Sequence, residues 1–190
     1  WDEEALWSVP IEPLYRFSFV SSANIQYLIV SDGRNVYAIT PEGTVEDISP
    51  STPVPSRYVT FCNLNGVLVF NSLARGPCYW TGPGTDLVDL PNWPATWKCE
   101  GMAAYKYYLV AYAMHEDSVR YEHKIRWSVS AEEGSVPAEW TPAVSNDAGD
   151  DILGETSGAL IGSRLVQDAL WLIKKDAIYA LSWIGQPFVM

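Results

Sequence analysis

The sequence predicts an all-β protein, a β-propeller-like array of about four antiparallel blades that forms part of a larger propeller. A strand that is apolar on both faces recurs around Leu28, Leu68, Leu109 and Leu172, at spacings of 40, 41 and 63 residues. Each copy is followed by a turn and then by a second strand that contains an aromatic residue. A repeat of about 40 residues with these parts is typical of a propeller blade.

The clearest copy of the repeat covers residues 64–80. Its Asn65-Gly66 pair predicts a two-residue turn, because both residue types tolerate positive φ angles. The strand that follows, residues 67–70, reads Val-Leu-Val-Phe, so that the valines face one side of the sheet and Leu and Phe face the other. Such a strand must be covered on both sides.

In chain order, residues 1–190 are expected to form a single propeller portion. Its blades are predicted at residues 14–50, 56–92, 97–143 and 158–185. Residues 44–48 and 86–90 are expected to be outer strands of the first two blades, because their acidic residues suit an exposed sheet edge. The polar stretch 114–123 is interpreted as a long hairpin tip, and residues 3–7 as a short helical turn. An antiparallel sandwich with accidental spacing is the alternative fold.

Composition places the chain among folded proteins. Of its 190 residues, 48% are hydrophobic and 18% are charged, and no apolar run reaches the roughly 20 residues of a membrane span. The chain begins at Trp1 with acidic residues unlike those of a signal peptide, and we expect it to be a fragment of a longer chain. Its net charge of -11 argues against nucleic-acid binding through clustered phosphate contacts. Its three cysteines, an odd number without a CxxC spacing, are predicted to be buried free thiols.

Two groups of residues raise the question of chemistry. His115 and His123 flank Glu116, Asp117 and Glu122, which could be drawn as a metal or acid-base site. A metal needs three or four converging ligands, however, and a solvated hairpin tip is the preferred interpretation. No catalytic, cofactor or metal site is therefore predicted here.

The second group lies at residues 145–152, which resemble one copy of the Asp-box of sialidase-like propellers, Ser-x-Asp-x-Gly-x-x-aromatic. Ile152 stands where the motif has its aromatic residue. The carboxylates of Asp147, Asp150 and Asp151 could also form a calcium-binding loop. An ordinary acidic turn is the preferred interpretation. This segment and the many aromatic residues favour the alternative function, a glycan-binding or sialidase-like propeller.

Four segments carry a likeness to a known family: residues 106–111, 123–128, 134–140 and 147–149. Together with Asn65-Gly66-Val67, Tyr79-Trp80 and residues 165–179, they make the chain similar to the tail-nozzle (tail tubular) proteins of short-tailed bacteriophages. The likeness extends over nearly the whole chain. Its positions are those of blade cores and of turns between blades.

The resemblance implies a structural, non-enzymatic virion protein of the phage tail, present in the host cytoplasm during assembly. It implies a ring of six copies, with the head-tail adaptor and tail fibre proteins as neighbours, through which the genome passes without specific binding. We hypothesise that acidic residues in loops, with Glu116, Asp117, Asp150 and Asp151 as candidates, face the channel and repel DNA. A third interpretation is a cytoplasmic scaffold propeller that binds peptides through an exposed apolar surface.

Overall fold

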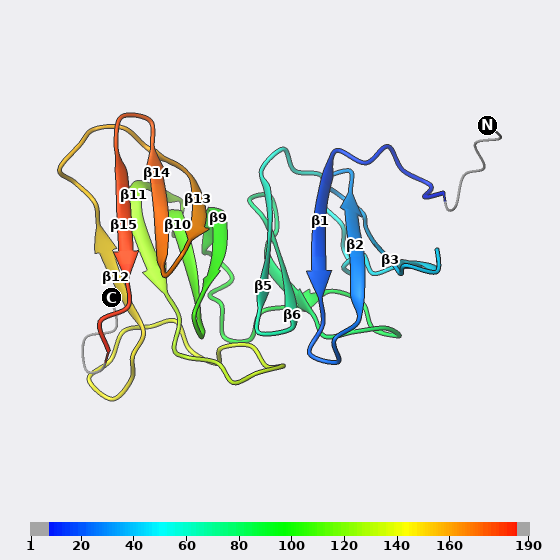
Figure 1. The fold of residues 1–190 in the computed structure, drawn as a ribbon. Helices are drawn as coiled ribbons and strands as arrows, with labels where there is room; N and C mark the ends of the chain where they lie inside the picture. The colour runs from blue at the N-terminus through cyan, green and yellow to red at the C-terminus, as the bar shows by residue number, and fades with distance from the viewer. Residues whose placement is uncertain (1–7, 186–190) are drawn as a thin grey trace.

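The computed structural model of the chain describes residues 8–185, and this part is all-β, as predicted (Figure 1). Its strands form four antiparallel sheets, which we call blades 1 to 4. The described residues contain no helix, and so none that is long and apolar enough to cross a membrane. The helical turn predicted at residues 3–7 lies outside the described residues.

Each blade takes its strands in the order of the chain. Blade 1 contains β1 (Tyr15–Val20), β2 (Gln26–Ser31), β3 (Val36–Ile39) and β4 (Val45–Asp47). Blade 2 contains β5 (Val59–Leu64), β6 (Val67–Ser72), β7 (Gly76–Trp80) and β8 (Val88–Asp89). Blade 3 contains β9 (Lys98–Tyr105), β10 (Tyr108–Glu116), β11 (Val119–Trp127) and β12 (Gly149–Ile152). Blade 4 contains β13 (Leu160–Val166), β14 (Ala169–Lys174) and β15 (Ile178–Ser182).

The blades follow one another in a propeller-like arrangement. Within each blade every strand pairs with its successor in the sequence, which gives an up-and-down meander. Between blades the first strands meet: β1 contacts β5, β5 contacts β9, and β9 contacts β13. In addition, β9 contacts β6 and β7, and β13 contacts β10. In Figure 1, blades 1 and 2 form one half of the array and blades 3 and 4 the other. The first strands are therefore the innermost ones, and the last strand of each blade is an outer edge.

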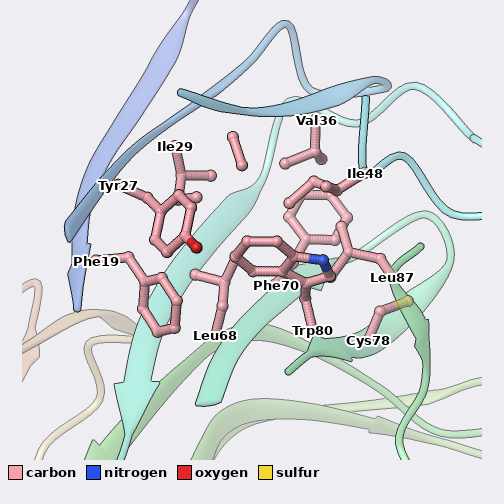
Figure 2. Packing of buried hydrophobic residues seen from close by; sticks show 11 residues of the cluster. Phe19, Tyr27, Ile29, Val36, Ile48, Leu68, Phe70, Cys78, Trp80 and Leu87 are labelled. Atoms are coloured by element: carbon pink, nitrogen blue, oxygen red, sulfur yellow. The ribbon is translucent and has the colours of Figure 1, made fainter. Parts of the chain in front are cut away.

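Apolar clusters fill the spaces between consecutive blades. The cluster between blades 1 and 2 packs Trp80 edge-on against Tyr27, with ring centroids 5.2 Å apart (Figure 2). Strand β6 is buried at every position: Leu68 and Phe70 belong to this cluster, whereas Val69 belongs to the cluster between blades 2 and 3. This confirms the prediction that the strand at residues 67–70 is covered on both faces.

The turn at Asn65-Gly66 has the predicted form. Its φ angles are 48° and 87°, and the flanking residues Leu64 and Val67 are paired, so the loop contains two residues. A Cβ atom on Gly66 would lie 2.4 Å from the backbone nitrogen of Ser22 in the first turn of blade 1. Glycine is thus required here both by the backbone angle and by the close approach of the neighbouring blade.

The interpretation of residues 114–123 as a long hairpin tip was wrong. Strands β10 and β11 continue through this stretch, pairing Met114 with Tyr121 and Glu116 with Val119. Only Asp117 and Ser118 form the turn, with φ angles of 49° and 72°. Alternating apolar residues among the polar ones suit a pleated strand, so polar composition alone did not indicate a loop.

The acidic turn expected at residues 145–152 is in part a strand, because Gly149–Ile152 forms β12, the outer strand of blade 3. Blade 3 therefore extends to Ile152, beyond the predicted end at residue 143. Aspartate is unfavourable in strands. In this strand Asp150 lies opposite Arg126 of β11, whose positive charge offsets that disadvantage.

Candidate functional site

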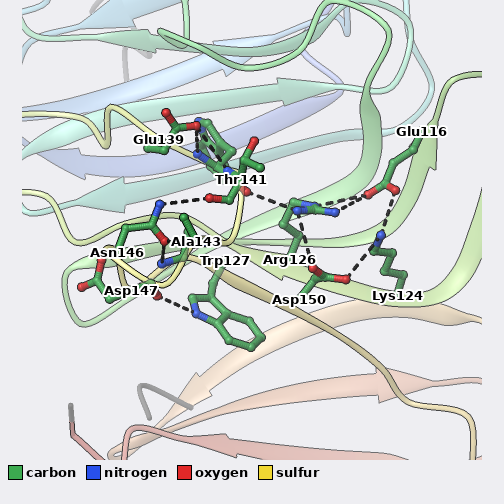
Figure 3. Close-up of polar contacts among 12 residues, drawn as sticks. Glu116, Lys124, Arg126, Trp127, Glu139, Thr141, Ala143, Asn146, Asp147 and Asp150 are labelled. Carbon is green, nitrogen blue, oxygen red and sulfur yellow. Dashed lines mark hydrogen bonds and ion pairs between the residues drawn. The ribbon is translucent and has the colours of Figure 1, made fainter. Parts of the chain in front are cut away.

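Two of the four acidic residues singled out in the sequence belong to one ionic cluster, which we call the blade 3 charge cluster: Glu116, Lys124, Arg126 and Asp150 (Figure 3). Lys124 Nζ lies 2.8 Å from Glu116 Oε2 and 3.4 Å from Asp150 Oδ2. Arg126 Nη2 lies 3.1 Å from Glu116 Oε1, and its Nη1 lies 3.6 Å from Asp150 Oδ1. Two cations and two carboxylates thus neutralise one another across three strands.

Arg126 is the centre of this cluster. Its side chain is only 6% exposed, and Nη1 also donates a hydrogen bond to the backbone oxygen of Trp140 at 3.2 Å. The guanidinium lies over the ring of Trp97, 4.3 Å from the centroid, which adds a cation-π contact. The cluster therefore joins β12 and the connection from residue 128 to 148 to the β10-β11 hairpin.

The other two singled-out residues, Asp117 and Asp151, are exposed. Asp117 Oδ1 accepts a hydrogen bond from Thr96 Oγ1 at 2.6 Å, and Asp151 Oδ1 accepts one from the Ile152 amide at 2.7 Å. Neither forms an ion pair within residues 8–185. The description of all four residues as loop residues was wrong: Asp117 is in a turn, whereas Glu116, Asp150 and Asp151 are in strands.

The two histidines do not converge on one site. His115 Nε2 lies 3.4 Å from Glu100 Oε1, whereas His123 Nε2 lies 3.5 Å from Glu122 Oε1. In the part of the chain that the structure describes, no group of three or more His, Cys, Asp or Glu side chains is placed to hold a metal ion. Each histidine is thus a member of its own pair.

The carboxylates of the Asp-box-like segment point to different partners. Asp147 Oδ2 accepts a hydrogen bond from the Tyr108 hydroxyl at 2.9 Å, while Asp150 belongs to the blade 3 charge cluster. Burial is the largest cause that raises the pKa of Tyr108, and the hydrogen bond to Asp147 is the second. Asp147 also accepts the Trp127 indole N–H at its backbone oxygen, at 3.0 Å. Asp147 thereby fixes the path of the chain into β12, and the arrangement indicates a structural role.

All three cysteines are buried and free, which confirms the prediction made from their number and spacing. Burial raises the pKa of Cys62 and of Cys78 to about 12, and it raises the pKa of Cys99 well above its usual range. Thiols in this state are protonated at neutral pH and are poor nucleophiles. Their role is to pack between blades.

Lys174 was missed in the sequence. It is 3% exposed, and its Nζ donates hydrogen bonds to the backbone oxygens of Leu153 at 2.7 Å and Thr156 at 2.6 Å. The ammonium group also lies 5.6 Å from the centroid of the Tyr179 ring. The signal was present in β14, where Lys174 follows the buried Leu170 and Leu172 in strict alternation. This lysine fastens the linker between blades 3 and 4.

A pocket of about 280 Å³ opens beside the outer strand of blade 2. Its walls include Trp93 and Trp97, together with Arg75 and Asp89. The last two form an ion pair, with 2.7 Å between Arg75 Nη1 and Asp89 Oδ1. Aromatic rings beside polar groups can bind a sugar, so this pocket is a candidate site for a glycan-binding function.

Comparison with known proteins adds no relative to this picture: neither the protein-family models nor the curated proteins give a match to the chain. The site is therefore interpreted from its geometry. The members of the blade 3 charge cluster are paired with one another, and the three cysteine thiols are buried. The exposed carboxylates of Asp117 and Asp151 lie in a turn and in β12.

Proposed function

We propose that this chain is a structural, non-enzymatic part of the tail of a short-tailed bacteriophage, forming with other copies a ring through which DNA leaves the particle. The support comes from the sequence resemblance together with the blade architecture. Two of the four singled-out carboxylates, Glu116 and Asp150, join strands of blade 3 through ion pairs, as suits a protein whose task is mechanical. In this proposal the ring contains six copies and meets the head-tail adaptor and the tail fibres.

The observation that carries the proposal is where the resembling segments lie in blade 3. Residues 106–111 contain the turn into β10 and its first residues, 123–128 contain the end of β11, and 147–149 lead into β12. Residues 134–140 include Trp140, which is fully buried in the cluster between blades 2 and 3. The likeness thus falls on positions that shape a blade and its junction with the next one.

The acidic surface gives the proposed conduit a physical rationale. A net charge of -11 disfavours the persistent phosphate contacts that would hold a passing duplex. Because Glu116 and Asp150 are neutralised by Lys124 and Arg126, Asp117 and Asp151 are the stronger candidates for repelling DNA at a channel wall. A ring that turned both of these residues to its outer wall would contradict this part of the proposal.

Immunogold labelling of purified tailed particles tests the proposal, using antibodies raised against the full chain and particles produced from the genome that encodes it. We expect label at the tail and the chain among the particle proteins by mass spectrometry. Particles that contain no copy of the chain would refute the proposal. An antibody against the portal protein of the same particles provides a positive control for access to the tail.

A glycan-binding propeller is the second candidate, favoured by the pocket that contains Trp93 and Trp97. One face of the Trp97 ring is already covered by Arg126, so a sugar would stack on Trp93 or on the remaining face. Glycan-array binding that is lost in Trp93→Ala but retained in Trp183→Ala, at an exposed tryptophan that does not line this pocket, would support this function. Absence of binding at millimolar sugar concentrations would exclude the glycan-binding function.

A further inference from the structure

The pocket of about 280 Å³ beside β8, which we call the β8 pocket, lies in the interior of the array. Its walls come from the connection between blades 1 and 2, from blade 2 itself, and from the connection between blades 2 and 3. All of them belong to consecutive elements between Thr52 and Trp97, and neither blade 1's first face nor blade 4 contributes to them. The pocket is thus complete within the described blades.

Two charged side chains line the β8 pocket, and they neutralise one another. Arg75 Nη1 lies 2.7 Å from Asp89 Oδ1. The side chain of Arg75 is 12% exposed, whereas that of Asp89 is 75% exposed. The other residues of the wall are uncharged. A charged ligand therefore finds no unpaired opposite charge in this wall.

The ion pair keeps hydrogen-bonding capacity toward the pocket. A guanidinium has five N–H donors and a carboxylate has two acceptor oxygens. Among residues 8–185, Nε and Nη2 of Arg75 and Oδ2 of Asp89 have no hydrogen-bond partner, since Nη1 of Arg75 makes the contacts to Asp89 Oδ1 and Cys78 Sγ. The exposed Thr52 adds a hydroxyl group on another wall. The wall thus offers both donors and acceptors, which match hydroxyl groups.

The aromatic part of the wall is held in place by its neighbours. Trp93 Nε1 donates a hydrogen bond to the backbone oxygen of Trp97 at 2.9 Å. The Trp93 ring also packs edge-to-face with the fully buried Trp140, with ring centroids 4.7 Å apart. Arg126 lies over one face of Trp97. The pocket is therefore preformed, which lowers the entropy cost of binding a ligand.

Together these properties restrict the ligand. An apolar ligand would remove water from Arg75 and Asp89 without replacing its hydrogen bonds, which costs free energy. An anion on Arg75 would have to displace Asp89, and a cation on Asp89 would have to displace Arg75. A neutral sugar avoids these costs, because its hydroxyl groups can bond to both members of the ion pair while its C–H groups lie on an aromatic ring.

We propose that the β8 pocket binds a single neutral sugar unit, with two neighbouring hydroxyl groups on Arg75 and Asp89 and the apolar side of the sugar ring on Trp93. A volume of about 280 Å³ is small for a ligand site, which suits one sugar unit. The inference rests on the glycan-binding candidate and names its ligand class. It also separates that candidate from a sialidase-like function, whose substrate is an acidic sugar.

An NMR titration of the full 190-residue chain tests the ligand class, with methyl glycosides of neutral hexoses and the matching methyl uronides as probes. The indole N–H signal of Trp93, identified by its loss in Trp93→Phe, reports on the pocket. We expect the neutral glycosides to shift this signal at millimolar concentrations. Each uronide should bind no more tightly than its neutral counterpart, because its carboxylate finds no unpaired cation.

Asp89→Asn provides the decisive comparison, since it keeps the size of the side chain but removes its charge. The dissociation constant of the neutral glycosides should rise at least about tenfold, because a hydrogen bond to a charged acceptor is lost. The uronides should instead bind more tightly than to wild type, because Arg75 is no longer neutralised. A purely structural role of Asp89 would not reverse the preference in this way.

The matched control is Asp86→Asn, at an exposed aspartate that precedes β8 and does not line the pocket. This variant should bind both kinds of probe like wild type. Circular dichroism and thermal unfolding of each variant establish that the fold is intact. Asp89 is mostly exposed, so we expect its substitution to leave the fold unchanged.

Two results would overturn the inference and leave glycan binding standing: uronides that bind wild type more tightly than their neutral counterparts, or neutral binding that is unchanged in Asp89→Asn. A Trp93 signal that no probe shifts would overturn both the inference and the glycan-binding candidate. None of these results depends on whether the chain occurs in phage particles. The labelling experiment decides the proposed tail function separately.

Discussion

The second strands of blades 2 and 4 are both largely apolar but differ in what covers them. In blade 2 the second strand, β6, is buried at every residue, because blade 1 packs on one face and blade 3 on the other. In blade 4 the equivalent strand, β14, buries Leu170 and Leu172 against blade 3 but leaves Trp171 partly exposed. Burial in a blade array thus depends on position in the array as much as on the strand itself.

This difference indicates that an apolar strand in a repeat does not by itself determine how far its side chains are buried. Val69 and Trp171 occupy equivalent positions, and both are large enough to fill a space between two sheets. Only Val69 has a sheet above it within residues 8–185. The predictions that follow compare the interior of the array with its terminal or exposed parts, beginning with the largest expected effect.

The largest effect should come from one substitution made at both equivalent positions. Val69→Asp would bury a carboxylate without a partner and should lower the free energy of unfolding by at least about 4 kcal/mol. Trp171→Asp should lower it by about 1 kcal/mol, since the new carboxylate reaches water. Urea unfolding of both variants at low protein concentration measures the difference. Equal losses would show that the two positions are not distinguished by coverage.

The succession of blades could be predicted from the sequence because its signals are local. Two-sided apolar strands, the Asn65-Gly66 turn and the acidic outer strands each follow from short stretches of chain. The length of the β10-β11 hairpin could not be predicted in this way. Polar residues in a strand resemble those in a loop until their pairing partners are known, and β12 depends on a partner strand more than 20 residues away.

A second comparison sets a buried ion pair against an exposed one in the same blade. Arg126→Gln should lower the free energy of unfolding by about 3 kcal/mol, because it removes the centre of the blade 3 charge cluster and leaves Glu116 and Asp150 with Lys124 alone. Arg120→Gln, in the exposed pairs with Glu100 and Glu122, should lower it by less than about 1 kcal/mol. Thermal and urea unfolding provide both values, and similar losses would contradict the structural role of the cluster.

The charge cluster itself was only half visible in the sequence. Glu116 and Asp150 were singled out as acidic residues, but their partners Lys124 and Arg126 were not connected with them. Lys124 and Arg126 alternate in one strand and so share a face, which is a usable signal. The partners of Lys124 and Arg126 depend on how β10, β11 and β12 pair. Spacing within one segment of the sequence cannot predict that pairing.

Alkaline pH should lower the free energy of unfolding through the buried thiols in the interior of the array. The folded pKa of Cys62 and of Cys78 is raised to about 12, so unfolding releases thiols that ionise above pH 9. Their contribution to stability is complete below the unfolded pKa and is lost as pH rises toward the folded one. Between pH 7.5 and 9.5 each thiol should therefore lower the free energy of unfolding by about 1 kcal/mol.

Urea unfolding at the two pH values measures this loss. In Cys78→Ala the free energy of unfolding should depend less on pH than in wild type. The same variant compared at pH 7.5 alone provides the control for lost packing. Since blade 4 contains no cysteine, Leu172→Ala should destabilise the protein by a similar amount at both pH values. A stability that does not change up to pH 9.5 would show that the thiols are solvated.

The smallest effect is expected at the exposed tip of blade 3, where no neighbouring blade contributes. Ser118 has a φ angle of 72°, which a residue with a Cβ atom adopts at a disadvantage. Ser118→Gly creates the Asp-Gly turn preferred by two-residue hairpins and should raise the free energy of unfolding by about 0.5 kcal/mol. The same change at Ser72, which is fully buried in β6, should lower it instead. Opposite signs for one substitution at two places would separate backbone preference at a tip from packing between blades, and equal signs would contradict the assignment of Asp117 and Ser118 as the turn.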